Sequence, residues 1–290
     1  MQAATHPQRL ALRGVDHTAR PTWKLKETVA FYRDILGLPL VHTISARGWG
    51  PATHPDFLHF FFDSGNGSTI AFFYYLGTSA PQEMEGRSLG KPWPEDFVTD
   101  ATHTAWLVDE DEDLLAWKSR LQEKGVEVSV ETRHEVIESI YFRDPNGYFL
   151  EITRKLRTLE PRDARDAQLT IEAAIRLESE REGGIAGLGA IDEIWREKAA
   201  GLLPDAQPGV ARLPVLKVPE FQPLVDSARA QPGCRVHDID DAYWVVESPG
   251  PMEFGRKSLG LKPAVWYGLF TGGLQGRITV FDRDIVRIEP

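Results

Sequence analysis

Residues 15–19 read Val-Asp-His-Thr-Ala, and residues 101–105 read Ala-Thr-His-Thr-Ala. The same order of signals follows each stretch: a helical pattern, a glycine that ends it, and three strand-like runs. A repeated order of elements around an anchor motif indicates two copies of one supersecondary unit. One such unit leaves a sheet face exposed, so we expect the two copies to close against each other.

One helix is predicted in each copy. Apolar residues recur at helical spacing over residues 25–36 and again over residues 114–121. Gly37 and Gly125 follow these patterns, where a left-handed residue commonly caps a helix.

Three β-type runs follow each helix, so each copy has the order β-α-β-β-β. The last two runs are joined by residues that favour tight turns, Asp-Ser-Gly-Asn-Gly at 63–67 and Asp-Pro-Asn-Gly at 144–147. Each connector predicts a hairpin. The expected strands are residues 38–43, 57–62 and 69–75 in the first copy and 127–131, 138–143 and 148–153 in the second.

The character of the sequence changes after residue 157. Charged helical patterns come first, prolines become frequent over residues 202–233, and short strand candidates follow without a third His-Thr-Ala unit. The expected helices are residues 163–182 and 191–200, and the expected strands are 243–247, 264–270 and 277–288.

The predicted fold class is therefore α+β, with two regions. Residues 1–157 are expected to form a paired βαβββ domain, with modules at about 13–78 and 99–156 that share one open-barrel metal pocket. Residues 158–290 are expected to form a C-terminal α+β extension, helical first and then made of short strands.

Composition and charge exclude several classes of partner. The chain has 290 residues, a net charge of −10 and a pI near 5.3, and no basic run that would favour a nucleic acid. Its one cysteine, Cys234, excludes a disulfide framework and a thiolate metal cluster. No signal-peptide core or membrane-spanning run is evident, so we expect a cytoplasmic protein without a membrane partner.

Three side chains stand where paired modules would bring them together. His17 and His103 occupy equivalent first-strand positions, and Glu151 lies on the last strand of the second module. Two imidazoles and one carboxylate leave positions open on an octahedral ion, which suits non-haem Fe(II), with Mn(II) as the second choice. A single histidine is more often a surface or structural residue. A carboxylate inside the run Phe-Leu-Glu-Ile at 149–152 is harder to explain without a partner.

A longer motif surrounds Glu151. Residues 132–134 read Thr-Arg-His, and residues 140–151 read Ile-Tyr-Phe-Arg-Asp-Pro-Asn-Gly-Tyr-Phe-Leu-Glu. This stretch resembles the signature of the type I extradiol ring-cleavage dioxygenases in the vicinal oxygen chelate (glyoxalase/bleomycin resistance/extradiol dioxygenase) superfamily. The resemblance covers about residues 13–156. It implies Fe(II) as the cofactor, a small aromatic compound and O2 as substrates, and a homodimer as one possible assembly. The metal ligands that it implies are His17, His103 and Glu151.

The resemblance also implies roles for two further residues. His134 would donate a hydrogen bond to the bound oxygen and stabilise the charge that develops there. Tyr141 would hydrogen-bond a substrate oxygen and fix its orientation. The alternatives are a solvated loop histidine and a half-buried strand tyrosine.

The substrate side of the pocket departs from the family pattern. Ser68 stands where well-known members have an acid–base histidine, and a serine hydroxyl cannot take up a proton at neutral pH. His59, on the facing strand, is one candidate replacement, and His54 is another. The aromatic residues expected to share the face of the metal ligands and contact substrate are Phe60, Phe62 and Phe72.

The leading function is an Fe(II)-dependent extradiol-type dioxygenase that cleaves the ring of a catecholic or related aromatic compound with O2. The first alternative is a glyoxalase-like lyase or isomerase, or a thiol transferase, of the same superfamily. Residues 68–75 contain no Asp, Glu, His or Gln, which disfavours a four-ligand Zn or Ni site. The second alternative is a non-catalytic protein of the resistance type that binds a small molecule.

Overall fold

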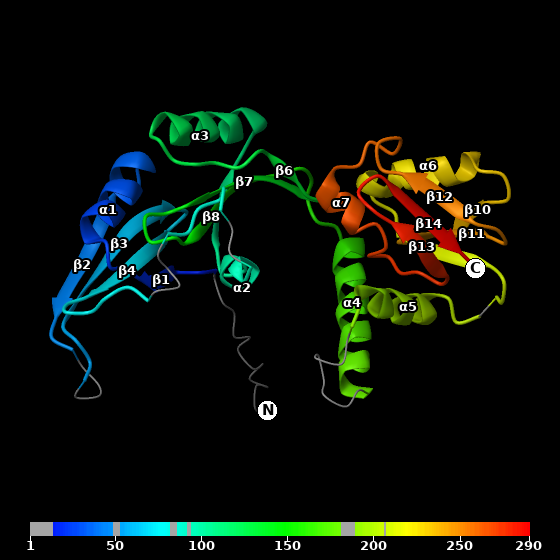
Figure 1. Ribbon diagram of the computed structural model, residues 1–290, viewed down its shortest axis with the longest axis horizontal. Coiled ribbons are helices and arrows are strands. Elements are labelled where there is room, and N and C mark those ends of the chain that lie inside the picture. The colour runs from blue at the N-terminus through cyan, green and yellow to red at the C-terminus, as the bar shows by residue number, and fades with distance from the viewer. Residues whose placement is uncertain (1–13, 49–52, 82–85, 92–93, 181–188, 206) are drawn as a thin grey trace, which may run out of the picture. The chain divides into compact units, whose positions relative to one another are not determined.

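The computed structural model describes residues 14–48, 53–81, 86–91, 94–180, 189–205 and 207–290 (Figure 1). The chain is α+β, as predicted, and divides into two compact units. The N-terminal unit is Met1–Glu131 with Ser139–Arg154, and the C-terminal unit is Thr132–Glu138 with Lys155–Pro290. None of the described helices is long and apolar enough to cross a membrane.

The first module has the predicted β-α-β-β-β order. Its four strands form one sheet in the order β1-β4-β3-β2, in which β1 runs parallel to β4 and the other pairs are antiparallel. Asn66 has a φ of 52° and Gly67 a φ of 77°, so the β3–β4 hairpin uses the positive-φ residues that the sequence offers there. The elements are β1 (His17–Pro21), α1 (Leu25–Val29), a π-helical turn η1 (Ala30–Ile35), β2 (Leu40–Ala46), β3 (Phe57–Gly65) and β4 (Ser68–Tyr75).

The second module repeats this plan, with a sheet in the order β5-β8-β7-β6. The expected strand at 127–131 is wrong, because only Val128 forms an isolated bridge there, to Phe142. The backbone N–H of Tyr141 donates to the side chain of Ser129 instead of to a neighbouring carbonyl, which interrupts a regular ladder. The elements are α2 (Asp96–Asp100), β5 (Thr104–Val108), α3 (Asp111–Glu123), β6 (Thr132–Arg133), β7 (Ile137–Arg143) and β8 (Phe149–Lys155).

The two modules meet through their helix-covered sides. Phe31 packs against Phe142, and Tyr32 donates a hydrogen bond of 3.2 Å to Asp144. The side chain of Asn146, in the second module, forms hydrogen bonds with the hydroxyl groups of Thr22 and Thr28 in the first. The modules therefore share one apolar core, and these polar contacts lie beside it. The two four-stranded sheets are separate among the described residues, and the open-barrel pocket stays a prediction.

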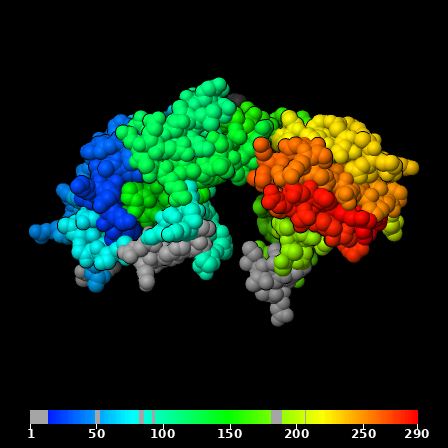
Figure 2. Space-filling model, turned by 45° about the horizontal axis from the view of Figure 1, so that its top comes forward, coloured from blue at the N-terminus to red at the C-terminus, as the bar shows by residue number. Residues whose placement is uncertain are grey.

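The C-terminal unit has two three-stranded sheets, ordered β10-β11-β9 and β12-β14-β13. Figure 2 shows the red residues of β13 and β14 at its surface. The two expected helices are present, although residues 181 and 182 of the first lie outside the described residues. The elements are α4 (Pro161–Glu180), α5 (Ile191–Leu202), β9 (Ala211–Leu216), η4 (Pro219–Phe221), α6 (Gln222–Ala230), β10 (Arg235–Asp238), β11 (Tyr243–Ser248), β12 (Met252–Gly255), α7 (Pro263–Tyr267), β13 (Arg277–Phe281) and β14 (Ile285–Glu289).

The strand expected at 264–270 is wrong, because this segment begins with helix α7. Pro263 occupies the start of the helix, where its missing N–H has no intrahelical partner to lose, and Val265 and Trp266 are buried. The proline-rich stretch holds strand β9, which contains Pro214. This strand lies at the edge of its sheet, where a residue without an N–H is tolerated.

Candidate functional site

The open sheet face of the second module carries the functional residues. Side chains alternate along β8, so Phe149 and Glu151 share one face, while Leu150 and Ile152 are buried in the core on the other. This confirms the predicted facing of the strand. Tyr141 from β7 stacks on Phe149 with ring centroids 5.1 Å apart, so both strands contribute to this face.

Glu151 is buried, with 4% of its surface exposed, and contacts two polar side chains. Its Oε1 atom accepts a hydrogen bond of 2.5 Å from the Ser139 hydroxyl. Its Oε2 atom lies 3.0 Å from Nε2 of His103. The structure therefore brings together two of the three predicted metal ligands.

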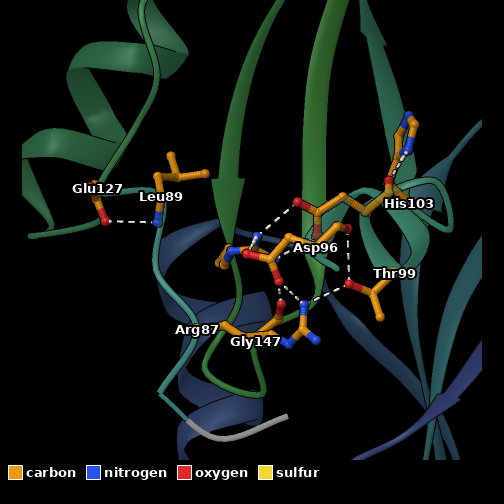
Figure 3. A network of polar contacts seen from close by, with 9 residues as sticks. Arg87, Leu89, Asp96, Thr99, His103, Glu127 and Gly147 are labelled. Atoms are coloured by element: carbon orange, nitrogen blue, oxygen red, sulfur yellow. Dashed lines mark hydrogen bonds and ion pairs between the residues drawn. The ribbon is translucent and has the colours of Figure 1, made fainter. Parts of the chain in front are cut away.

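Both ring nitrogens of His103 face oxygen atoms. Its Nδ1 atom lies 2.8 Å from the backbone oxygen of Asp100 (Figure 3). A carbonyl oxygen only accepts hydrogen bonds, so a ring that donates from Nδ1 has Nε2 left to face the carboxylate of Glu151. Because the carboxylate also only accepts, Nε2 either donates a proton of its own to Glu151 or shares a metal ion with it.

The spacing of this pair fits adjacent ligands on one metal ion. Imidazole and carboxylate ligands commonly lie about 2.0–2.2 Å from a divalent metal such as zinc, so neighbours at a right angle are about 3 Å apart. The observed 3.0 Å between His103 and Glu151 meets this requirement. The hydrogen bond from Ser139 and the carbonyl of Asp100 supply the outer contacts that orient metal ligands in proteins.

His17 is not part of this cluster. Its Nδ1 atom contacts the neighbouring Asp16 at 2.7 Å, and its side chain is 44% exposed. Within the described part of the chain, no three His, Cys, Asp or Glu side chains are close enough to hold a metal ion. One chain thus presents a two-ligand pair on one module and His17 on the other.

The face of the first module that carries His17 is rich in aromatic rings. The rings of His17, His42 and His59 each approach the ring of Phe61, with centroids 4.3–5.8 Å apart. His59 also stacks on Phe73 at 3.7 Å. Burial, followed by the nearby His17 and His42, lowers the pKa of His59. Its Nε2 atom is buried without a hydrogen-bond partner in the described structure, so the neutral ring is favoured.

The expected substrate residues Phe60, Phe62 and Phe72 lie on the opposite face. They are almost fully buried and pack with Phe31 and Tyr32 in the core. Their predicted placement beside the metal ligands is therefore wrong. Residues 57–62 are apolar at almost every position, so alternation of polarity could not distinguish the two faces.

Ser68, the residue that replaces the family histidine, begins strand β4. Its hydroxyl donates a hydrogen bond of 2.6 Å to the backbone oxygen of Val15. This contact fixes the chain just before β1. The Ser68 hydroxyl is thereby engaged in a structural role.

The two predicted catalytic residues lie in different units. Burial and the nearby Glu151 raise the pKa of Tyr141, so its phenol stays protonated on the sheet face that carries Glu151. His134 belongs to the C-terminal unit, where its backbone N–H donates to Ile137 and its side chain lines a cavity of about 300 Å³. The role of His134 stays a prediction.

A second cavity, of about 340 Å³, lies in the N-terminal unit beside residues that contact His103, although neither His103 nor Glu151 lines it. Its wall includes Asp100 and Phe149, and Phe149 meets the ring of His103 edge to face at 6.0 Å. Small-molecule sites commonly have volumes of about 300–1,000 Å³. In Figure 2 the cyan residues around α2 lie at the surface, where Val98 contributes an exposed apolar wall to this cavity.

Three residues that contribute to this site were not predicted from the sequence. Ser139 could have been found, because it precedes Tyr141 by two positions and therefore shares its strand face. Arg143 and Asp100 meet across distant segments, with two hydrogen bonds of 2.8 Å, and no local pattern signals that contact.

Comparisons with known proteins point to the same superfamily as the sequence motif around Glu151. Residues 14–152 match the model of the Glyoxalase/Bleomycin resistance protein/Dioxygenase superfamily. A biphenyl-2,3-diol 1,2-dioxygenase of Rhodococcus globerulus is 36% identical over 73 residues. That match covers 25% of this chain and spans only 35% of the length of the relative.

The solved structures each cover about half of the chain. Lactoylglutathione lyase from Agrobacterium tumefaciens has 23% identity and a TM-score of 0.34, over 50% of this chain and 95% of its own. A fosfomycin resistance protein from Listeria monocytogenes has 21% identity and a TM-score of 0.35, over 51% and 97%. Both TM-scores are low, so these likenesses carry no weight for function. The family match supports membership of residues 14–152 in the glyoxalase/bleomycin resistance/dioxygenase superfamily.

Proposed function

We propose that the chain is an Fe(II)-dependent extradiol-type dioxygenase, with Mn(II) as the second choice of metal, that opens the ring of a catecholic compound with O2. One observation carries the proposal: Nε2 of His103 faces the buried carboxylate of Glu151 at 3.0 Å while Nδ1 is bound to a carbonyl. The match to a dioxygenase of a vicinal diol supports the substrate class. When bound, the metal would bring the diol and O2 together and allow electrons to pass between them.

Other residues of the same face would bind and orient the diol. Tyr141 has a raised pKa and keeps its proton, so it would donate a hydrogen bond to a substrate oxygen. Phe149, between Tyr141 and His103, offers an aromatic surface for a planar ring. Ser139 holds the carboxylate of Glu151 in place.

We propose that His17 reaches this pair from a second copy of the chain. His17 and His103 occupy equivalent positions in the two modules. In a twofold dimer, the face that carries His17 in one copy would lie against the face that carries His103 and Glu151 in the other. Symmetry would then complete two three-ligand sites, one for each copy. The faces expose apolar side chains that such a contact would cover. Ile44, on the His17 face, is 37% exposed, and Leu107, on the Glu151 face, is 54% exposed.

His59 is the proposed acid–base group in place of the family histidine. It shares the face of His17, and its lowered pKa leaves the ring neutral and able to accept a proton at neutral pH. Ser68 donates to a carbonyl and supplies no such group.

The test is anaerobic reconstitution of the full chain with Fe(II), followed by oxygen uptake against a panel of catechols. The proposal predicts iron-dependent uptake with at least one vicinal diol, and loss of both bound iron and uptake in Glu151→Ala. A wild-type chain that binds iron but consumes no O2 with any vicinal diol would exclude the dioxygenase. Tight binding of Zn or Ni without oxygen demand would instead favour the glyoxalase-like alternative.

A further inference from the structure

A cavity of about 300 Å³ in the C-terminal unit combines an apolar wall with a carboxylate. All of its lining residues belong to this unit. Leu259, Leu261 and Val265 form part of the apolar wall, and each belongs to the core of the unit and is less than a tenth exposed. Glu135 lines the same cavity. A hollow of this size, with an apolar wall and polar groups in fixed places, is typical of small-molecule sites.

Glu135 is a carboxylate without a polar partner in the described part of the chain. No hydrogen bond or ion pair between described residues reaches it. Burial, followed by the nearby carboxylates of Glu220 and Asp166, raises its pKa. A carboxylate that is partly removed from water and lies near other carboxylates is stabilised most by a positive charge against it. Among the described residues, what is missing beside Glu135 is a cation in direct contact.

Two cations lie near enough to Glu135 to interact with its charge, and both are engaged elsewhere. The guanidinium of Arg157 donates to two other carboxylates and to a carbonyl. The ammonium group of Lys198 has three N–H donors, and three acceptors lie 2.5–2.8 Å from it. The acceptors are Glu220, Asp163 and Thr158 for Arg157, and Asp166, Thr170 and Thr271 for Lys198.

Two further cations of the cavity lining, Arg133 and Lys262, are exposed to solvent. Water and dissolved salt screen an exposed charge, so these side chains offset a carboxylate inside the cavity only weakly. The lining thus leaves one interior negative charge beside an apolar wall. A molecule that complements both features carries a positive charge at one end and an apolar group at the other.

We propose that this cavity binds a small organic ammonium ion, with its charged group at Glu135 and its apolar part against Leu259, Leu261 and Val265. The ammonium group would donate charge-assisted hydrogen bonds to the carboxylate, and the apolar part would be removed from water. A metal ion fits less well, because no three His, Cys, Asp or Glu side chains of the described residues are close enough to hold one. The inference does not rest on the proposed function, which concerns the other unit.

The test uses the full chain at pH about 8.5. There Glu135, with a pKa of about 7, is ionised, and an ordinary alkylamine with a pKa of about 10.4 carries a proton. Calorimetry gives the dissociation constants of cyclohexylammonium, the neutral cyclohexanol and the anion cyclohexanecarboxylate, which share one ring and differ in charge. The wild type is expected to bind cyclohexylammonium about 10–100-fold more tightly than cyclohexanol, the usual effect of hydrogen bonds to a charged group.

Two variants assign the preference to one side chain. Glu135→Gln keeps the shape of the side chain and removes its charge, so it should bind cyclohexylammonium no more tightly than cyclohexanol. Glu253→Gln is the matched control, because Glu253 is an exposed carboxylate on β12 of the same unit and does not line the cavity. This variant should keep the wild-type preference.

A wild-type chain that shows no preference for cyclohexylammonium over cyclohexanol, or binds neither, would overturn the inference, and this comparison needs no variant. Equal or tighter binding of cyclohexanecarboxylate would also overturn it and would indicate Arg133 and Lys262 as the binding groups. A folded Glu135→Gln that keeps the preference would place the ammonium ion elsewhere. An equal loss in Glu253→Gln would reduce the effect to one of net charge.

Discussion

Replacement of Glu135 by glutamine should stabilise the C-terminal unit, and only at high pH. Glu135 lines the 300 Å³ cavity of this unit beside Arg157 and Glu220. Burial, followed by the nearby carboxylates of Glu220 and Asp166, raises its pKa from 4.5 to about 7. Arg157 opposes the rise, but this guanidinium already donates to Asp163 and Glu220. The charged groups that act on Glu135 or respond to it are Glu220, Asp166, Asp163, Arg157 and Lys198.

The size of the effect follows from this pKa. Each pH unit between the folded and unfolded pKa is worth about 1.4 kcal/mol, so a rise from 4.5 to about 7 corresponds to about 3 kcal/mol. The folded pKa is the higher one, so the favourable contribution is complete below pH about 4.5 and is lost as the pH rises through about 7. Glutamine has no proton to lose. Glu135→Gln should therefore match the wild type at pH about 4 and exceed its stability by up to about 3 kcal/mol at pH about 8.5.

The assay is urea unfolding of the full chain at both pH values, followed by the fluorescence of the buried Trp195 and Trp266 of this unit. Glu253→Gln is the control, because Glu253 is an exposed carboxylate on β12 of the same unit. It should change stability equally little at both pH values. A Glu135→Gln variant that gains nothing between pH about 4 and about 8.5, or loses stability at the higher pH, would refute the reasoning.

Three further predictions concern the ligand face and the C-terminal core. Tyr141→Phe should keep Mn²⁺ affinity within about twofold and lower the oxygen-uptake rate about 10–100-fold, because it removes a substrate hydrogen bond of about 1.5–3 kcal/mol and a contact with Ser139 but leaves both ligand side chains in place; equal loss of affinity by calorimetry would contradict it. Ser139→Ala, which removes the 2.5 Å hydrogen bond to Glu151, should weaken Mn²⁺ binding about tenfold or more; unchanged affinity would count against the orienting role. Lys198→Met leaves the buried Asp166 without its 2.5 Å partner and should cost about 3–5 kcal/mol in urea unfolding, which a loss below about 1 kcal/mol would contradict.

Much of the N-terminal fold could be predicted because local signals and global order agree there. The His-Thr-Ala repeat, the capping Gly37 and Gly125, and the turn at 144–147 each specify one local structure. The facing of β8 was also predictable, because Glu151 sits between apolar neighbours. The helix at Pro263 was not, since a short apolar run is compatible with either a strand or a buried helix.

The site was harder to predict than the fold for a physical reason. The residue types that can bind a metal and their strand positions can be read from the sequence, and His103 and Glu151 do meet at 3.0 Å. Which sheet face the aromatic residues occupy depends on packing against Phe31 and Tyr32, and the run at 57–62 carries no polar marker of it. The pairing of Arg143 with Asp100 depends on tertiary contact alone.

Mixing two inactive variants tests most directly whether His17 of one copy completes the His103–Glu151 pair of another. His17→Ala and Glu151→Ala each lack a ligand in every site, whether the site lies within one chain or between two. If two copies share the site, exchange of subunits creates mixed dimers with one intact site each, and the mixture should recover about a quarter of the wild-type Fe(II) binding and oxygen uptake. A mixture that exchanges subunits but stays as inactive as either variant alone, beside an active wild type, would contradict the account.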